Sequence, residues 1–195
     1  GTIADSEIDW SKITAPKESA FRDCKNLTSV DNPTFTNGFL SDLFRGCSNL
    51  THLEVSTTML NPQYGNSTMR ACSKVKEITL HFLNPNLRGT GVFAGTYFFC
   101  DDTILETVIL HVPNNSGFRL SSSNLFYSTP ALRNLVLKFD KGVVNYYGGG
   151  WGLPHWGGIY SNPTESTIYV PQALISDYQT ATNWSNLYAA GVTFA

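Results

Sequence analysis

One pattern of apolar residues recurs along most of this chain and limits the folds that the chain can adopt. Its clearest copy spans residues 41–55 and has the skeleton Phe-x-x-Cys-x-x-Leu-x-x-Leu-x-Val. From Leu40 to Cys47 the apolar residues are three and four positions apart, which predicts one buried face of a short helix. From Leu50 to Val55 the pattern ends in alternation, which predicts a strand with one buried face. The expected repeating unit is therefore a short helix followed by a strand.

Five copies of the pattern align on the first apolar residue of each predicted strand. These anchors lie 23, 25, 30 and 27 residues apart, and they are Leu27, Leu50, Val75, Leu105 and Leu132. An aromatic residue or Met stands six positions before each anchor, at Phe21, Phe44, Met69, Phe99 and Phe126. A weaker sixth copy contains Ile168 and Val170. Repeats of this length predict a solenoid, in which each copy buries its apolar face against its neighbours.

The repeated motif resembles a known family. Residues 24–30 (Cys-Lys-Asn-Leu-Thr-Ser-Val) and 47–53 (Cys-Ser-Asn-Leu-Thr-His-Leu) are similar to the BspA-type leucine-rich repeat of bacterial surface proteins, and residues 167–171 resemble the way such arrays end. The resemblance covers roughly residues 8–188, although the fourth and fifth copies lack the Cys. It implies an α/β repeat fold, namely a right-handed leucine-rich repeat solenoid with short parallel strands and short helices, capped at both ends. It also implies export and a role in adhesion.

We expect one elongated domain across residues 1–195. Its expected parts are an N-terminal cap at 1–20, repeats at 21–141, an aromatic and Gly-rich insertion at 142–163, and a last strand with a helical C-terminal cap at 164–195. The ends of a repeat stack must hide apolar edges from water. Trp10 is therefore expected to cover the first repeat, and a helix at about 171–182 is expected to cover the last one.

Three of the four cysteines occupy the same position of the repeat. Cys24, Cys47 and Cys72 should therefore form a column inside the stack, where we expect buried free thiols. A disulfide between stacked neighbours is the alternative, but parallel side chains give poor geometry for it. No Cys-x-x-Cys pair is present to hold zinc, and Cys100 lies outside the column as an isolated thiol.

Composition excludes several classes of function. Charged residues make up 14% of the chain and the formal net charge is −2, so a surface that follows nucleic-acid phosphates is not expected. No apolar run reaches the ~20 residues that cross a bilayer, and we expect an export signal and any anchor to lie outside residues 1–195. The chain has no Gly-x-Ser-x-Gly, and Gly148-Gly149-Gly150 lacks the Lys of a phosphate loop. Asp101 and Asp102 are expected to be solvated or to cap a helix.

The repeat register also predicts which residues lie side by side on the outer face of the sheet. One column should contain Ser56, His81, His111 and Lys138, and a second should contain Glu54, Thr79, Ile109 and Val136, becoming apolar toward the C-terminus. In a third column, His52 should meet Glu77. His81 and His111 either share a transition metal or are exposed and solvated. We expect the second, because Ser56 and Lys138 are poor further ligands. No metal or cofactor is expected.

Residues 143–160 combine aromatic side chains with many glycines. The candidate ligand-binding residues there are Tyr146, Tyr147, Trp151, His155, Trp156 and Tyr160. Exposed Trp and Tyr rings with polar neighbours are suited to stacking on a sugar or a peptide. The same rings are also suited to covering the open end of the solenoid, and both interpretations stay open at this point.

Together these features indicate a non-catalytic binding module of a bacterial cell-surface or secreted protein. The expected partner is a protein or glycan at a host or matrix surface, and the sequence does not indicate an oligomeric state. One alternative is a carbohydrate-active enzyme that uses Asp140 and Glu165 as its acids. A second alternative is a structural module that spaces other domains.

Overall fold

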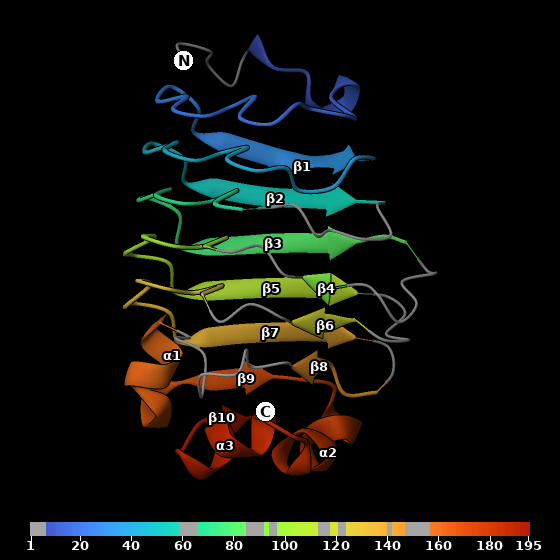
Figure 1. Ribbon diagram of the computed structural model, residues 1–195, viewed down its shortest axis with the longest axis vertical. Helices are drawn as coiled ribbons and strands as arrows, with labels where there is room; N and C mark the ends of the chain where they lie inside the picture. The colour runs from blue at the N-terminus through green and yellow to red at the C-terminus, as the bar shows by residue number, and fades with distance from the viewer. Residues whose placement is uncertain are drawn as a thin grey trace.

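The computed structural model describes residues 7–58, 66–84, 92–93, 97–112, 118–120, 124–139, 142–146 and 157–195. Its main feature is an open sheet of seven parallel strands, stacked one above the next along the molecule (Figure 1). In spatial order the strands are β1 (Ser29–Phe35), β2 (His52–Thr57), β3 (Glu77–Phe82), β5 (Thr107–Val112), β7 (Asn134–Phe139), β9 (Thr167–Tyr169) and β10 (Thr193–Phe194). The predicted stack of short parallel strands is confirmed.

A second sheet and a few short helices complete the described elements. The second sheet is parallel and consists of β4 (Val92–Phe93), β6 (Arg119–Leu120) and β8 (Asn145–Tyr146). The helices are α1 (Gly157–Ser161), α2 (Ile175–Thr180) and α3 (Trp184–Ala189), with 3-10 turns at Trp10–Lys12, Pro163–Glu165 and Gln172–Leu174. None of the described helices is long and apolar enough to span a membrane.

The segment before each of the first five strands of the stack is a series of turns and not the short helix that the spacing predicts. These segments are residues 18–23, 41–46, 66–71, 97–101 and 124–128. Left-handed residues with φ between 54° and 75° recur eight and four positions before the anchors, at Ser19, Asp23, Asp42, Gly46, Ser67, Ala71, Tyr97, Asp101 and Ser128. A left-handed residue every fourth position interrupts an α-helix, because L-residues favour the right-handed form.

The interrupted backbone bonds to the neighbouring copy instead of to itself. The Phe21 N–H donates to the Leu43 carbonyl at 3.0 Å, and the Phe44 N–H donates to the Thr68 carbonyl at 2.8 Å. The Phe99 N–H makes the equivalent bond to the Leu125 carbonyl at 3.1 Å. The turns therefore form their own ladder beside the starting ends of the strands, which satisfies backbone groups that a helix would pair internally.

Matching positions of the repeat form continuous columns in the core. The Phe21 and Phe44 rings stack with centroids 5.3 Å apart, and Phe99 and Phe126 do so at 5.2 Å. Beside them the Cys47 thiol donates to the Phe21 carbonyl at 3.0 Å. One repeat later the Cys72 thiol donates to the Phe44 carbonyl at 3.2 Å. All four cysteines are free and buried, so the predicted thiol column is confirmed.

Asp102 occupies the column position of the fourth copy, and the prediction that it is solvated or caps a helix is wrong. It is 0% exposed, and its Oδ1 accepts the Cys72 N–H at 2.6 Å. Its Oδ2 is buried without a hydrogen-bond partner among the described residues. Burial raises the pKa of the Asp102 carboxyl well above its usual range. Asp101, by contrast, is partly exposed and pairs with Arg70, as expected for a surface carboxylate.

Aromatic side chains cover both ends of the stack. At the N-terminal end the Trp10 ring packs on Phe21 with centroids 5.2 Å apart. At the other end the fully buried Trp184 donates from Nε1 to the Val144 carbonyl at 2.7 Å. The Val144 N–H donates to the Tyr178 hydroxyl at 3.0 Å, and the Tyr178 and Trp184 rings lie 5.3 Å apart. Helices α2 and α3 thus close the stack below β10 (Figure 1).

Candidate functional site

The outer face of the main sheet brings the predicted strand-face residues together. In the backbone register, Ser56 lies opposite His81, His81 opposite His111, and His111 opposite Lys138. The second column also has the predicted order, from Glu54 through Thr79 and Ile109 to Val136. The predicted change from a polar to an apolar face is therefore confirmed.

His81 and His111 contact one another, and the prediction that both are exposed and solvated is wrong. Their Nδ1 atoms are 3.2 Å apart, and His81 Nε2 lies 2.7 Å from Glu54 Oε1. Only 20% of the His81 side chain is exposed. A neutral imidazole has one nitrogen that donates and one that accepts, so a chain of hydrogen bonds can link these residues across β2, β3 and β5. Among the described residues no cluster of three or more metal-ligating side chains is present.

The predicted third column places its residues differently. His52 pairs with Asp31 of β1 and not with Glu77, and the pair is ionic only when the imidazole is protonated. Asp31 Oδ1 lies 3.7 Å from His52 Nε2. The two side chains are 55% and 66% exposed, and Glu77 is exposed as well. An ion pair this exposed is screened by water and stabilises the fold little.

A pocket of about 280 Å³ opens at the C-terminal end of the same outer face. Its lining residues are His111, Val136, Leu137, Lys138, Phe139, Tyr169, Val170 and Pro171. Tyr169 lies opposite Val136 in the register, which extends the apolar column by one strand, and the residue is 42% exposed. The sequence analysis recognised the sixth copy from Ile168 and Val170 but did not extend this column to Tyr169, which stands between them.

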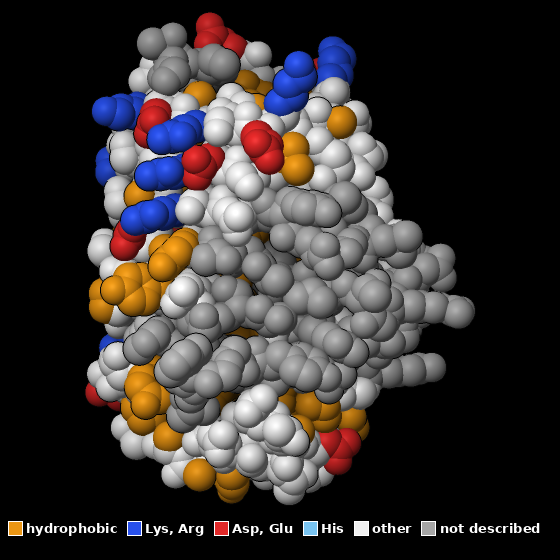
Figure 2. Space-filling view, viewed as in Figure 1, with side chains coloured by type: hydrophobic (Ala, Val, Ile, Leu, Met, Phe, Trp, Pro, Cys, Tyr) orange, Lys and Arg blue, Asp and Glu red, His pale blue; other side chains and the backbone are white. Residues whose placement is uncertain are grey.

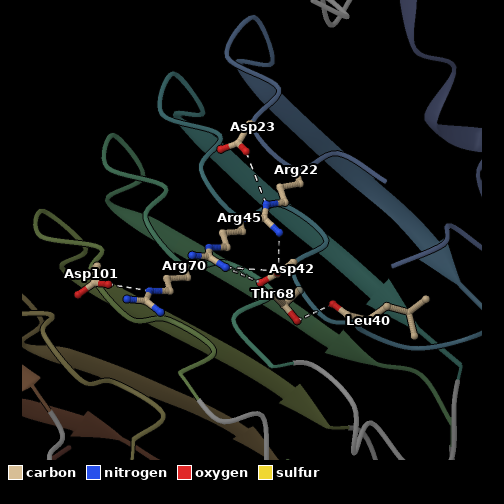
Figure 3. A network of polar contacts seen from close by, with 8 residues as sticks. All are labelled: Arg22, Asp23, Leu40, Asp42, Arg45, Thr68, Arg70 and Asp101. Carbon is tan, nitrogen blue, oxygen red and sulfur yellow. Dashed lines mark hydrogen bonds and ion pairs between the residues drawn. The ribbon is translucent and has the colours of Figure 1, made fainter. Parts of the chain in front are cut away.

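A ladder of charges runs along the turns (Figure 3). Arg22, Arg45 and Arg70 occupy the same repeat position, two residues before each column Cys. Arg22 lies 3.1 Å and Arg45 3.4 Å from the Asp42 carboxylate, and Arg70 Nε lies 2.7 Å from Asp101. Each guanidinium is therefore paired with a carboxylate, Arg22 and Arg45 sharing that of Asp42. The Arg22–Asp42 and Arg70–Asp101 pairs link neighbouring turns.

The aromatic segment is described only in part. Tyr147, Trp151, His155 and Trp156 lie outside the described residues, and Tyr146 is placed by its backbone in β8. Tyr160 lies on α1 with 47% of its surface exposed. It borders a second pocket that Tyr127 also lines, a neighbour that the sequence pattern did not indicate.

The two acids named for a glycosidase are not brought together in the described residues. Asp140 lies outside the part of the chain that the structure describes. The Glu165 side chain is 70% exposed and lies 3.5 Å from Arg133. A carboxylate in this setting is solvated and paired, whereas a glycosidase needs two carboxyl groups roughly 5–10 Å apart in a cleft.

Comparisons with known proteins agree with the repeat geometry. A family model described as "BspA type Leucine rich repeat region (6 copies)" matches residues 5–108, just over half of the chain. No curated protein and no solved structure matches the chain. In the structure the stack continues past the matched region through β7, β9 and β10.

Proposed function

Since this chain belongs to the BspA-type leucine-rich repeat family, we propose that it is a non-catalytic, protein-binding module of a bacterial cell-surface or secreted protein. Repeats of this type are often found in bacterial surface proteins, and leucine-rich repeats in general mediate protein–protein binding. The proposed partner is a protein at a host or matrix surface. The observation that carries the proposal is the pocket on the outer sheet face between β5, β7 and β9.

The rigidity of this face favours binding. Its strands are joined by backbone hydrogen bonds in one parallel register from β2 to β9. A partner that docks there orders few groups on this chain, so little conformational entropy opposes the association. The exposed Tyr169 and the partly exposed Val136 and Pro171 at the pocket supply the apolar contact that dominates binding energy at protein interfaces.

The side chains around the pocket suggest the chemistry of the segment that binds. Val136, Tyr169 and Pro171 line it with apolar surface. Lys138, which is exposed, and His111 lie beside one another at the same pocket. This arrangement suits an apolar side chain of the partner next to a carboxylate, which the Lys138 ammonium attracts. The chain of Glu54, His81 and His111 holds the imidazole in place.

The test uses two substitutions in the pocket and one outside it. Two sources of ligand are screened against the wild-type protein. One is a displayed library of random peptides, and the other is a panel of immobilised extracellular matrix proteins. The affinity of each ligand is then measured. Tyr169→Ala and Lys138→Glu should each weaken the ligands so found by about tenfold or more, which corresponds to about 1.4 kcal/mol. Tyr127 is exposed and lies on the turns, away from this pocket, so Tyr127→Ala should leave the affinity for these ligands unchanged.

Two results would count against this function. If neither the library nor the panel yields a saturable ligand, the chain is not a protein-binding module. If ligands appear but Tyr169→Ala and Tyr127→Ala affect them equally, binding does not use the outer sheet face. Measuring the melting temperature of each variant separates loss of binding from loss of folding.

A further inference from the structure

The side chains on the row of turns change along the molecule from charged to aromatic. The turns lie along the left edge of Figure 2. Charged side chains (Lys, Arg, Asp and Glu) gather on the upper part of this edge, and hydrophobic side chains, a class that includes Tyr, lie below them. Three tyrosines on this lower part are exposed, namely Tyr97 at 37%, Tyr127 at 47% and Tyr160 at 47%. The Tyr97 and Tyr127 rings meet edge to face with centroids 6.0 Å apart. Arg70, the last guanidinium of the ladder, lies 5.8 Å from the Tyr97 centroid.

Between the last two tyrosines lies a pocket of about 260 Å³. Its lining residues are Tyr127, Ser128, Thr129, Pro130, Gly157, Tyr160 and Ser161. None of these side chains carries a charge at neutral pH. The pocket therefore combines two exposed rings with hydroxyl groups and backbone polar groups.

Two glycines bring α1, which carries Tyr160, close to the turn that carries Tyr127. Gly157 begins α1 with φ of 49°, and a Cβ there would collide with the Thr129 hydroxyl. The Gly158 N–H donates to the Thr129 carbonyl at 2.8 Å. The helix can approach the turn of Tyr127 this closely only because these two positions have no side chain. Tyr160, one helical turn later, is thereby fixed next to that turn.

We propose that this pocket binds a neutral sugar ring of an oligosaccharide, whose chain continues over Tyr97. A pyranose presents a face of C–H groups and a rim of hydroxyls, which match an aromatic ring and a surround of polar groups. A neutral ligand is favoured because the described lining residues carry no charge and Arg70 is already paired with Asp101. The site lies on the turn edge and does not depend on the proposed protein-binding pocket of the outer sheet face.

The experiment titrates the whole protein with cellohexaose, N-acetylated chitohexaose and mannohexaose, all of them neutral, and follows binding by calorimetry. At least one of them should bind saturably. Tyr127→Ala and Tyr160→Ala should each weaken it at least tenfold, whereas Tyr127→Phe, which keeps the ring, should weaken it less than threefold. Tyr169→Ala, on the outer sheet face, is the matched control and should bind the sugar as the wild type does. These tyrosines are exposed, so all four variants should melt close to the wild-type temperature.

Three outcomes would overturn the assignment. The first is that none of the three hexasaccharides binds. The second is that Tyr169→Ala weakens the bound sugar as much as Tyr127→Ala does. The third is that polygalacturonate or a proline-rich decapeptide binds more tightly than every neutral sugar, because the pocket then recognises a charged polymer or a peptide. Each result is independent of the matrix-protein measurements on the sheet-face pocket.

Discussion

In the fourth copy of the repeat a carboxyl group stands where three earlier copies place a thiol. The Cys47 and Cys72 thiols each donate to a carbonyl of the preceding turn, but Asp102 accepts the Cys72 N–H and leaves Oδ2 without a partner among the described residues. Burial favours the neutral acid, so the pKa of Asp102 is raised above that of the unfolded chain. Stability from this group is fully present below its unfolded pKa and is lost as the pH rises toward its folded pKa.

Asp102→Asn should therefore stabilise the protein increasingly as the pH rises. The amide keeps an oxygen for the Cys72 N–H but has no charged form, so the pH-dependent loss disappears. Across the interval between the unfolded and folded pKa values, the difference in unfolding free energy from wild type should grow by about 1.4 kcal/mol per pH unit. Urea unfolding from pH 4 to pH 8 measures it.

Asp101→Asn is the control for this substitution. It removes the ion pair to a partly exposed Arg70, so its effect should stay within about 1 kcal/mol. A difference between Asp102→Asn and wild type that stays constant with pH would show that the carboxyl does not titrate in the core.

Single residues also mark what the repeat pattern can and cannot predict. The meeting of His81 and His111 followed from the spacing, because parallel copies in register bring equal positions together. The contact of His81 with Glu54 did not follow, since it joins two different columns and depends on side-chain direction. Likewise the position of Asp102 was clear from its place three residues before Leu105, but its burial depends on how the turn packs on both neighbours.

Among the elements, the turns differ most from expectation. Apolar residues three and four apart fit a helix, but a run of turns that places every third or fourth side chain inward fits them equally. The left-handed positions carry Ser, Asp, Ala and Tyr as well as Gly, so no regular glycine reveals them in the sequence. The turns are favoured because alternate N–H groups bond to carbonyls of the next copy. The sequence of a single repeat does not reveal these bonds.

Two opposite substitutions at one turn position test this account. Ala71 and Gly46 both stand four residues before an anchor and have φ of 61° and 75°. Ala71→Gly should stabilise the protein by roughly 0.5–1 kcal/mol, because relief of about 1–2 kcal/mol of left-handed strain exceeds the entropy that glycine adds to the unfolded chain. Gly46→Ala should destabilise it by about 1–2 kcal/mol, since the new Cβ also meets the Asp23 side chain.

Thermal or urea unfolding of both variants gives the comparison. Ala131→Gly provides the reference, because Ala131 is not among the left-handed residues and glycine there should destabilise by about 0.5–1 kcal/mol. If Ala71→Gly and Ala131→Gly lower stability alike, the left-handed backbone at Ala71 is not strained.

At the scale of the whole molecule, the main contacts between strands join neighbouring copies, so stability is close to a sum of repeats and interfaces. The Phe39 and Phe98 rings, 5.8 Å apart, add a contact that skips a copy. The need for covers at both ends could be inferred from the apolar columns alone. Which residues provide them could be inferred only in part, since Trp184 and Tyr178 hold Val144 across 34 or more residues of chain. The pocket of Tyr127 and Tyr160 was missed for a similar reason, because the folding of α1 onto an earlier turn depends on Gly157.

Trp184→Ala should loosen the C-terminal end before the middle of the stack. Loss of a fully buried Trp and of its bond to the Val144 carbonyl should lower the unfolding free energy by about 3–5 kcal/mol. Amide hydrogen exchange should speed up in β9 and β10 more than in β2 and β3, because terminal repeats depend most on the cap.

Tyr188→Ala on the same helix is the matched variant. Tyr188 is 49% exposed, so its loss should change stability by about 0.5 kcal/mol or less. Equal acceleration of exchange in every strand of Trp184→Ala would mean that the stack opens as one unit.

The reactivity of the buried thiols indicates where the stack opens locally. Burial raises the pKa of Cys47 and of Cys100 to about 12, and all four cysteines are buried and free. Alkylating and oxidising reagents must reach the sulfur and attack the thiolate, so buried thiols react slowly while the stack is closed. Mass spectrometry of alkylated peptides would give the alkylation rate of each cysteine, from Cys24 near one end to Cys100 past the middle. These rates would show how often each of the four turns that carry a cysteine opens, without any engineered probe.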